Sequence, residues 1–309
     1  MIEIKGLTKS FGKTQALKSL DLTIPPGQVY GLIGPNGAGK TTAMSIIATL
    51  LPADSGVAMV NGFDVTTEPQ NVRRQIGYMP DFFGVYDGLT AKEYLSFFAT
   101  AYHIPAAKQD QLILDLLELV NLPEKSDAYV DNLSRGMKQR LALARCLIHD
   151  PQVLILDEPA SGLDPRARAE LKEILQQLKQ MHKTVIISSH ILPELAEICD
   201  QVGILENGRL VASGSVAEIT AGGQGSKVIA IDALELLEEL VIYLQQYPGV
   251  KQVNVRSNQA RIVYHGDKTD QSQLLKNLIE QGFPVLQFAE QQGSLEEAFM
   301  AVTKEVISQ

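Results

Sequence analysis

The sequence predicts an α/β fold with a mixed sheet at its core, followed by a smaller α+β domain. Three short apolar runs, at residues 29–33, 153–156 and 184–188, alternate with helical patterns. Fully apolar strands are typical of a parallel sheet that is covered on both faces. A Gly-rich run at residues 221–226 then interrupts the pattern. We therefore expect one large domain over residues 1–220 and an accessory domain over residues 226–309.

The length and composition narrow the classes of protein to consider. The chain has 309 residues, 45% apolar residues, 20% charged residues and a net charge of −9. The acidic balance argues against nucleic acid as the main partner. Two cysteines, Cys146 and Cys199, favour buried thiols in a reducing compartment over a disulfide. No signal-peptide pattern occurs, and no apolar run reaches the roughly 18 residues that a membrane span needs. We expect a soluble protein whose membrane role, if any, depends on a partner.

The most informative motif is the stretch Gly34-Pro35-Asn36-Gly37-Ala38-Gly39-Lys40-Thr41-Thr42, which fits G-x-x-x-x-G-K-[ST]. It lies between the predicted strand at residues 29–33 and a predicted helix at residues 41–50. The glycines allow backbone N–H groups and the helix N-terminus to point at phosphate oxygens. Lys40 adds a positive charge, and the Thr41 hydroxyl can hold Mg²⁺. A coincidental Gly-rich turn explains the pattern less well, because the strand and the helix are both in place.

The surrounding segments build up the rest of the large domain. Residues 2–4 and 20–24 alternate like strands, and Asn61-Gly62 predicts an antiparallel hairpin over residues 57–65. From residue 89 to about residue 122 the apolar spacing becomes helical, which indicates a helical insertion over about residues 82–150. A second Asn-Gly pair, at residues 207–208, predicts another hairpin.

Polar groups follow two of the apolar strands. Asp157 and Glu158 come directly after residues 153–156, and His190 follows the strand at residues 184–188. In open α/β sheets, ligands bind at the carboxyl ends of the strands, so we expect these three side chains to act in one site. Two solvated acids in a turn would explain the charges but not the apolar strand before them.

The last 80 residues predict a compact order of strand, helix, strand, strand, helix and strand, with a final helix at residues 294–304. This order predicts a ferredoxin-like accessory domain for dimerisation or regulation. Tyr243, Tyr247, Tyr264 and His265 could line a pocket there, but core and surface roles explain them better.

Taken in order, the motifs of the first 220 residues resemble those of the ATP-binding subunit of an ABC transporter. Residues 34–42 look like its Walker A motif, 133–140 like its signature, 153–157 like Walker B, 161–164 like its D-loop, and His190 like its switch histidine. Arg135-Gly136-Met137 and the ending at residues 294–299 look most like the exporter branch whose permeases are of the ABC-2 type. The fold that this implies is a P-loop NTPase domain with an antiparallel β subdomain and a helical subdomain.

The resemblance also implies a mechanism. Two such subunits pair head to tail and sandwich two ATP molecules, which drives a separate integral-membrane ABC-2 type permease from the cytoplasmic face of the plasma membrane. Glu158 would polarise the attacking water, and His190 would contact the γ-phosphate. Phe11 would stack on adenine, and Ser134, Arg135 and Gly136 would meet the nucleotide of the other subunit. Thr41, Asp81 and Asp157 would surround Mg²⁺. Whether the partner subunit is a second copy or a different chain stays open, as does the transported substrate.

Two residues depart from the family pattern. Arg135 stands where the family usually has Gly, and its guanidinium either adds positive charge near phosphate or faces solvent. Asp81 stands where a Gln normally contacts Mg²⁺ and couples to the permease. A carboxylate can still ligate a hard cation, so we expect Asp81 to keep the metal role. The alternative is that Asp81 only caps the next turn.

A second class of function has to be weighed against transport. Soluble ABC ATPases act on ribosomes or nucleic acid, but they generally carry two cassettes or long insertions. This chain has one cassette and an acidic balance, which favours the exporter subunit.

Overall fold

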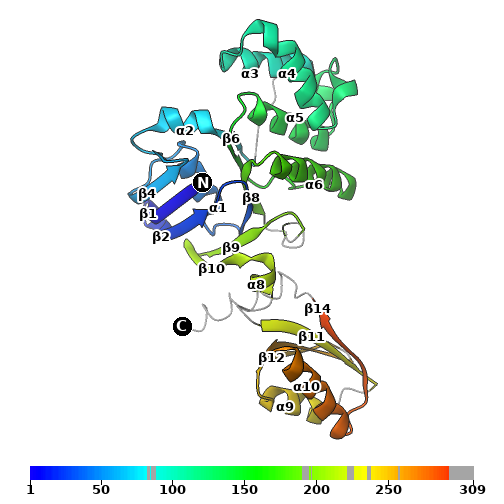
Figure 1. Ribbon diagram of the computed structural model, residues 1–309. Helices are drawn as coiled ribbons and strands as arrows, with labels where there is room; N and C mark the ends of the chain where they lie inside the picture. The colour runs from blue at the N-terminus through cyan, green and yellow to red at the C-terminus, as the bar shows by residue number, and fades with distance from the viewer. Residues whose placement is uncertain are drawn as a thin grey trace. The chain divides into compact units, whose positions relative to one another are not determined.

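The chain folds into two compact units, Met1–Ser213 and Gly214–Gln309. The computed structural model describes residues 1–81, 84, 88–189, 195, 197–220, 226–234, 238–256 and 258–291. Figure 1 shows the two units in sequence colours, and each is described by itself below.

A six-stranded sheet forms the centre of the first unit, in the order β10-β9-β3-β8-β7-β6. Its strands are β3 (Val29–Ile33), β6 (Ile76–Met79), β7 (Val153–Leu156), β8 (Thr184–Ser189), β9 (Gln201–Glu206) and β10 (Arg209–Ser215). The five strands from β9 to β6 pair in parallel, and every residue of β3, β7 and β8 is buried. The apolar runs therefore have the buried, parallel setting that the sequence predicts.

A second, antiparallel sheet has the order β2-β1-β4-β5. It consists of β1 (Ile2–Phe11), β2 (Thr14–Ile24), β4 (Ser55–Val60) and β5 (Phe63–Asp64). The hairpin at Asn61-Gly62 is confirmed, with both residues at positive φ (49° and 86°), as a type I′ turn requires. The strands β1 and β2 are longer than the predicted segments 2–4 and 20–24. Three register shifts interrupt the alternation of buried and exposed residues, so the sequence pattern shows only parts of each strand.

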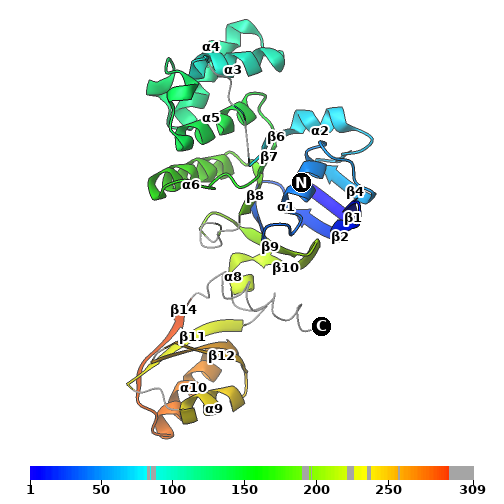
Figure 2. The same ribbon diagram turned by 180° about the vertical axis from the view of Figure 1, so that it is seen from behind.

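The helices of the first unit are α1 (Lys40–Ile47), α2 (Pro69–Gln75), α3 (Ala91–Ala101), α4 (Ala106–Leu119), α5 (Arg135–Leu147) and α6 (Pro165–Gln180). Short 3₁₀ turns at Pro123–Lys125 and Val130–Asn132 connect α4 to α5. A capping box between Thr90 and Glu93 starts α3, and the Asp164 side chain caps α6. Figures 1 and 2 show α3, α4 and α5 gathered in one helical lobe, whereas α1 lies in the β-rich part.

One apolar core joins the two sheets and α1. It contains Ile2 and Leu20 from the antiparallel sheet, Met44 and Ile47 from α1, and Ile155 from the central sheet. Since these side chains are buried from water together, α1 is held in place by both sheets.

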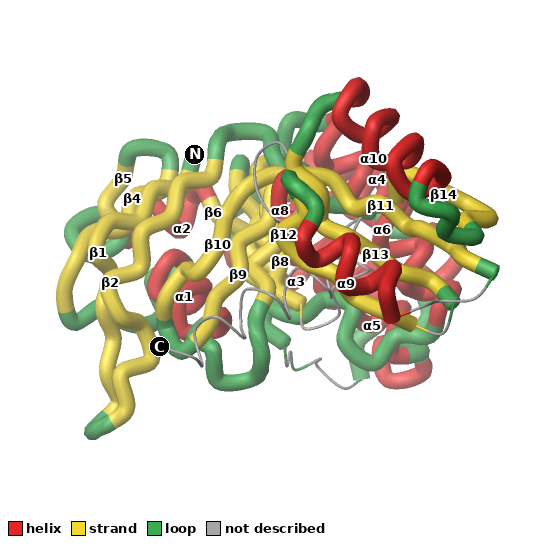
Figure 3. The backbone as a smooth tube through the Cα atoms, turned by 90° about the horizontal axis from the view of Figure 1, so that it is seen from below, coloured by secondary structure: helices red, strands yellow, loops and turns green. Residues whose placement is uncertain are grey.

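The second unit begins with α8 (Val216–Thr220) and contains β11 (Ser226–Ala233), α9 (Glu238–Gln246), β12 (Val250–Arg256), β13 (Gln259–His265), α10 (Lys268–Glu280) and β14 (Val285–Gln291). Its antiparallel sheet has the order β12-β13-β11-β14, which is the order of a ferredoxin-like fold. Leu240 and Leu244 of α9 and Leu274 and Leu278 of α10 pack on one face of that sheet. Figure 3 shows both helices lying across the strands. The predicted helix at residues 294–304 lies outside the described residues.

Within the described residues, none of the helices combines the length and the apolar character that crossing a membrane would require.

Candidate functional site: a phosphate loop beside two strand-end carboxylates

The phosphate loop, Gly34 to Thr42, leaves β3 and enters α1 as predicted. Gly37 and Gly39 have φ angles of +83° and +108°, which side chains rarely tolerate. A Cβ on Gly34 would lie 2.3 Å from the Leu205 carbonyl oxygen, and one on Gly39 would lie 2.6 Å from the Ala16 carbonyl oxygen. The loop is therefore pressed between β9 and β2, and only glycine fits at these two positions.

The start of α1 is open to a ligand. Gly39 occupies the N-cap position, so no side chain caps the helix. The first amide N–H groups of a helix have no partner within the helix, and together with the helix dipole they favour an anion. This local geometry is what a phosphate group requires.

Lys40 is the first residue of α1, and its side chain is only 6% exposed. Its ammonium Nζ donates to the Gly34 carbonyl oxygen at 2.6 Å and lies 3.4 Å from Oε1 of Glu158. The structure thus brings the predicted phosphate-binding lysine and the predicted water-polarising carboxylate into direct contact.

The two carboxylates follow β7, as predicted. Asp157 is 1% exposed, and its backbone N–H donates to the Met79 carbonyl oxygen of β6. Glu158 has a φ of +50°, an unusual conformation for this residue type. Strained backbone of this kind is concentrated at functional sites, where surrounding contacts hold it in place.

Ser188, near the end of β8, joins both residues. Its hydroxyl donates to Oδ1 of Asp157 at 2.6 Å and accepts the backbone N–H of Glu158 at 2.8 Å. Sequence reasoning placed Ser188 in a buried strand and assigned it no function. The available signal was its position, since a buried hydroxyl beside a strand-end carboxylate must find a hydrogen-bond partner.

Tyr78 of β6 is a second residue that sequence reasoning did not assign. Its phenol hydrogen-bonds the Ser45 side chain of α1, and the charges of Asp157 and Asp81 both act on it. Burial raises the pKa of Tyr78, and the two carboxylates raise it further, while the bond to Ser45 opposes them. Asp81 is exposed, one residue beyond the Pro80 that follows β6. Tyr78 is therefore a common neighbour of Asp81 and Asp157.

The donor groups fit a hard cation such as Mg²⁺. Oδ2 of Asp157 is buried and has no hydrogen-bond partner in the described part of the protein, whereas Oδ1 is bonded. Magnesium is typically held by one or two carboxylates together with phosphate oxygens and water. Among the described residues, no cluster of three or more His, Cys, Asp or Glu side chains could hold a metal alone. A magnesium ion here would depend on the nucleotide for much of its coordination.

The signature residues begin α5, in the helical lobe. The Ser134 hydroxyl caps this helix by accepting the N–H of Met137 at 3.3 Å. Gly136 faces α6 so closely that a Cβ on it would lie 2.9 Å from Cβ of Ala167. The Arg135 guanidinium covers Gly162 of the predicted D-loop, since a Cβ there would lie 2.6 Å from its Cζ. The signature and the D-loop therefore form one contiguous surface.

Two predicted residues stand apart from these contacts. Phe11 ends β1, is 52% exposed, and has the Lys9 ammonium 5.7 Å from its ring centroid. Its proposed stacking on adenine stays a prediction. His190 lies outside the described residues, which on β8 end at Ser189.

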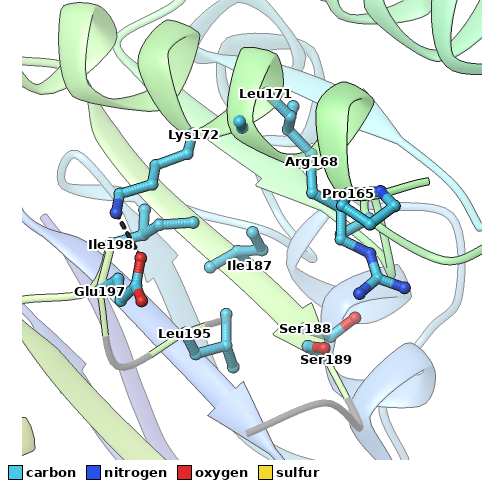
Figure 4. Close-up of a pocket in the computed structure, with 12 residues that line it drawn as sticks. Pro165, Arg168, Leu171, Lys172, Ile187, Ser188, Ser189, Leu195, Glu197 and Ile198 are labelled. Atoms are coloured by element: carbon cyan, nitrogen blue, oxygen red, sulfur yellow. Dashed lines mark hydrogen bonds and ion pairs between the residues drawn. The ribbon is translucent and has the colours of Figure 1, made fainter. Parts of the chain in front are cut away.

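A cavity of about 290 Å³ adjoins the end of β8. Figure 4 shows Ser188 and Ser189 on one side of it and Arg168 of α6 extending toward them. An ion pair between Lys172 and Glu197 lies at the other end. The cavity borders the end of β8, and none of its described lining residues belongs to the phosphate loop.

The fold and the site together define a P-loop ATPase. The family model "ABC transporter" matches residues 17–161, and the model "ATP-binding protein DrrA1-3-like, C-terminal domain" matches residues 214–303. The chain therefore belongs to the ATP-binding subunits of ABC transporters, and its relatives include export and resistance ATP-binding proteins.

Several curated relatives match along nearly the whole chain. The linearmycin resistance ATP-binding protein LnrL of Bacillus subtilis is 30% identical over 306 residues, 98% of each chain. The Nod factor export ATP-binding protein I of a Rhizobium species (strain N33) is 36% identical and covers 98% of this chain and 96% of its own. The daunorubicin/doxorubicin resistance ATP-binding protein DrrA of Streptomyces peucetius is 33% identical, with 98% and 92% coverage.

Solved structures agree with the fold of the first unit. An ATP-binding subunit of an ABC transporter superposes with a TM-score of 0.64 and 32% identity, over 71% of this chain and 91% of that one. A dimeric ATP-binding cassette in a post-hydrolysis state with ADP and Pi also has a TM-score of 0.64, with 25% identity over 70% of this chain and 98% of that one.

Proposed function

We propose that this ABC ATPase is the motor subunit of an exporter and drives a separate ABC-2 type permease from the cytoplasmic face of the plasma membrane. The observation that carries the proposal is the match to export and resistance ATP-binding proteins over 98% of the chain, which includes both units. A soluble ABC ATPase acting on ribosomes or nucleic acid is not favoured, since the relatives named above are export and resistance proteins.

The residues support the following chemistry. The amides of the phosphate loop and the Lys40 ammonium bind the β- and γ-phosphates of ATP. Glu158 accepts a proton from the attacking water, and His190 contacts the γ-phosphate. Asp157, Thr41 and Asp81 are the residues that would hold Mg²⁺, which neutralises charge on the phosphates when bound. Phe11 stacks on the adenine ring.

The signature belongs to a second subunit's site in this proposal. Ser134, Arg135 and Gly136 start a helix in the helical lobe, while the phosphate loop lies in the β-rich part (Figure 1). A head-to-tail pair would place the α5 N-terminus of each subunit, with its positive dipole end, over the ATP of the other. The dimeric cassette among the similar structures supports this arrangement.

Mixing two inactive variants tests the composite site. Lys40→Ala removes the phosphate contact, and Ser134→Arg blocks the signature. In a mixed pair, one site carries both defects and the other carries neither, so mixing should restore ATP hydrolysis that each variant alone lacks. If hydrolysis stays at the level of the separate variants while mixed pairs are present, each subunit has a self-contained site and the composite arrangement is wrong.

The permease would dock in a groove between the helical lobe and the core. A cavity of about 300 Å³ is lined by Tyr78, Phe98, Tyr102, Arg145 and Arg73 among others. It combines aromatic rings with two guanidinium groups, which suits a helical segment with an acidic residue. Its wall includes Tyr78 of β6, which pairs with Ile155 of β7, so the groove lies close to the strand that ends at Asp157 and Glu158.

Co-purification with a co-expressed ABC-2 type permease tests the partnership. Arg73→Glu reverses an exposed charge in the groove, and Arg74→Glu reverses the neighbouring exposed charge, which does not line it. We expect Arg73→Glu to lose the permease from detergent extracts and to keep its ATPase activity without the permease, while Arg74→Glu keeps both. Equal retention by both variants would place the docking surface elsewhere.

A further inference from the structure

The hydroxyl of Ser188 connects the two carboxylate-bearing residues of the site. Ser188 is fully buried on β8, and β8 pairs in parallel with β7, which carries Asp157 and Glu158 at its end. The hydroxyl oxygen lies 2.6 Å from Oδ1 of Asp157 and 2.8 Å from the backbone nitrogen of Glu158. We propose that Ser188 is a positioning residue, which orients Asp157 toward Mg²⁺ and holds the backbone of Glu158; the metal part rests on the proposed Mg²⁺ role of Asp157.

The chemistry of the three groups fixes the direction of both hydrogen bonds. The Glu158 N–H can only donate, so the Ser188 oxygen accepts from it. The single hydroxyl hydrogen is then left for Oδ1 of the Asp157 carboxylate. A side chain without a hydroxyl cannot make both bonds, and both partners would stay buried.

This arrangement assigns different tasks to the two oxygens of Asp157. Oδ1 is held by Ser188, while Oδ2 is buried and without a partner among the described residues. A buried carboxylate oxygen without a hydrogen bond is costly unless a ligand satisfies it. Fixing one oxygen sets the rotation of the carboxylate, so Ser188 determines where the other oxygen points.

The second bond acts on Glu158. Its φ of +50° is outside the range that a glutamate prefers, and such a conformation persists only where surrounding contacts enforce it. The bond from its N–H to Ser188 is one such contact, and the 3.4 Å contact of its carboxylate with Lys40 is another. One hydroxyl therefore influences both the metal-directed group and the water-directed group.

The competing explanation is that Ser188 only satisfies buried polar atoms and stabilises the sheet. The same strand supplies a control for this. Thr184 is also buried, and its hydroxyl also accepts a backbone N–H, that of Gly27 at 2.9 Å, but at the other end of β8. Thr184→Val should therefore match Ser188→Ala in lost stability without reaching Asp157.

The experiment measures the affinity for a non-hydrolysable ATP analogue by titration calorimetry, in EDTA and in Mg²⁺. The quantity compared is the dissociation constant in EDTA divided by the dissociation constant in Mg²⁺. For Ser188→Ala this ratio should fall by roughly 10- to 100-fold, the usual effect of losing a hydrogen bond that supports a metal ligand. The affinity in EDTA should change far less than the affinity in Mg²⁺, because the residues of the phosphate loop are untouched and only the hydrogen bond that holds the backbone of Glu158 is lost. Thr184→Val should keep the wild-type ratio while its melting temperature falls.

A second variant covers the case in which Ser188→Ala does not fold. Ser188→Cys fills the space with a thiol that is only a weak donor, so its ratio should fall by several-fold. A wild-type ratio in folded Ser188→Ala or Ser188→Cys, or an equal fall in Thr184→Val, would overturn the positioning role. If the wild-type protein itself binds the analogue equally with and without Mg²⁺, the proposed metal role fails instead.

Discussion

The contact between Lys40 and Glu158 predicts that removing the carboxylate strengthens ATP binding while it slows hydrolysis. Their side chains are 6% and 12% exposed, and Nζ lies 3.4 Å from Oε1. When ATP binds, a phosphate must replace Glu158 as the partner of Lys40. In the wild-type protein, the loss of the Lys40–Glu158 contact therefore offsets part of the free energy that the Lys40–phosphate contact contributes. Glu158→Gln keeps the size of the side chain and removes its charge.

The expected size of the effect follows from the kind of contact. Two unit charges about 4 Å apart attract each other by about 1 kcal/mol in bulk water and by about 4 kcal/mol near a protein surface, so an ion pair that is largely shielded from water contributes on the order of 2–4 kcal/mol. Since about 1.4 kcal/mol corresponds to a tenfold change in affinity, Glu158→Gln should bind ATP about tenfold more tightly or better. Hydrolysis should slow by roughly a hundredfold or more, because the group that polarises water is lost.

The assay measures ATP affinity in EDTA, which excludes turnover and the metal, and measures hydrolysis separately with Mg²⁺. Glu173→Gln is the control, because it makes the same change of charge at an exposed position on α6. If Glu158→Gln and the wild-type protein bind ATP equally in EDTA, the Lys40–Glu158 contact does not oppose binding. Hydrolysis at the wild-type rate would refute the role of Glu158.

Three further predictions concern stability, pH and the metal. Arg140 is buried, donates to the Val120 and Asn121 carbonyl oxygens and forms an ion pair with Glu170, so Arg140→Met should cost about 3 kcal/mol and lower the melting temperature by about 6–12 °C. Arg166→Met, which removes an exposed partner of the same Glu170, should change stability by less than about 0.5 kcal/mol; equal calorimetric shifts would contradict this. Burial lowers the pKa of His149, which donates to the Ile76 carbonyl oxygen, so the folded state binds fewer protons than the unfolded state. Its contribution is therefore present above the unfolded pKa of about 6.5 and is lost as pH falls below it, and the stability advantage over His149→Phe should shrink between about pH 7 and 5. For Asp81, the Mg²⁺ dependence of hydrolysis should weaken in Asp81→Ala and persist in Asp81→Gln, whereas identical curves in all three proteins would remove Asp81 from the metal site.

Local patterns were enough to predict most of the fold. The fully apolar runs at β3, β7 and β8 predict strands that are buried on both faces of a sheet, and all of their residues are buried. Asn61-Gly62 and Asn207-Gly208 adopt the positive φ angles that type I′ hairpins require. The lengths of β1 and β2 were not predictable in the same way. Each bulge shifts the alternation of buried and exposed residues, so a continuous strand looks like separate short ones.

The candidate site likewise contains residues that local patterns predict and residues that they do not. The phosphate loop, Asp157 and Glu158 belong to contiguous motifs that can be found in the sequence, whereas the contact between Lys40 and Glu158 became visible only in the structure. Ser188 and Tyr78 act across neighbouring strands, and the partner of a side chain in a sheet depends on strand order and register. A single sequence does not contain that information in any local pattern, so both residues became visible only in three dimensions.

The close packing of the phosphate loop against β2 and β9 predicts that nucleotide binding also stabilises residues outside the site. The turn after β9 holds the loop and β2 together, because the Gly208 N–H donates to the Ala38 carbonyl oxygen and its own carbonyl accepts the Lys18 N–H. A loop fixed by two sheets before ATP arrives loses little conformational entropy on binding. A ligand that binds only the folded loop also stabilises the neighbouring elements that hold the loop, which are β2 and the turn after β9. Amide hydrogen exchange in β2 and β9 should therefore slow when ATP binds, at backbone positions that contact no part of the nucleotide.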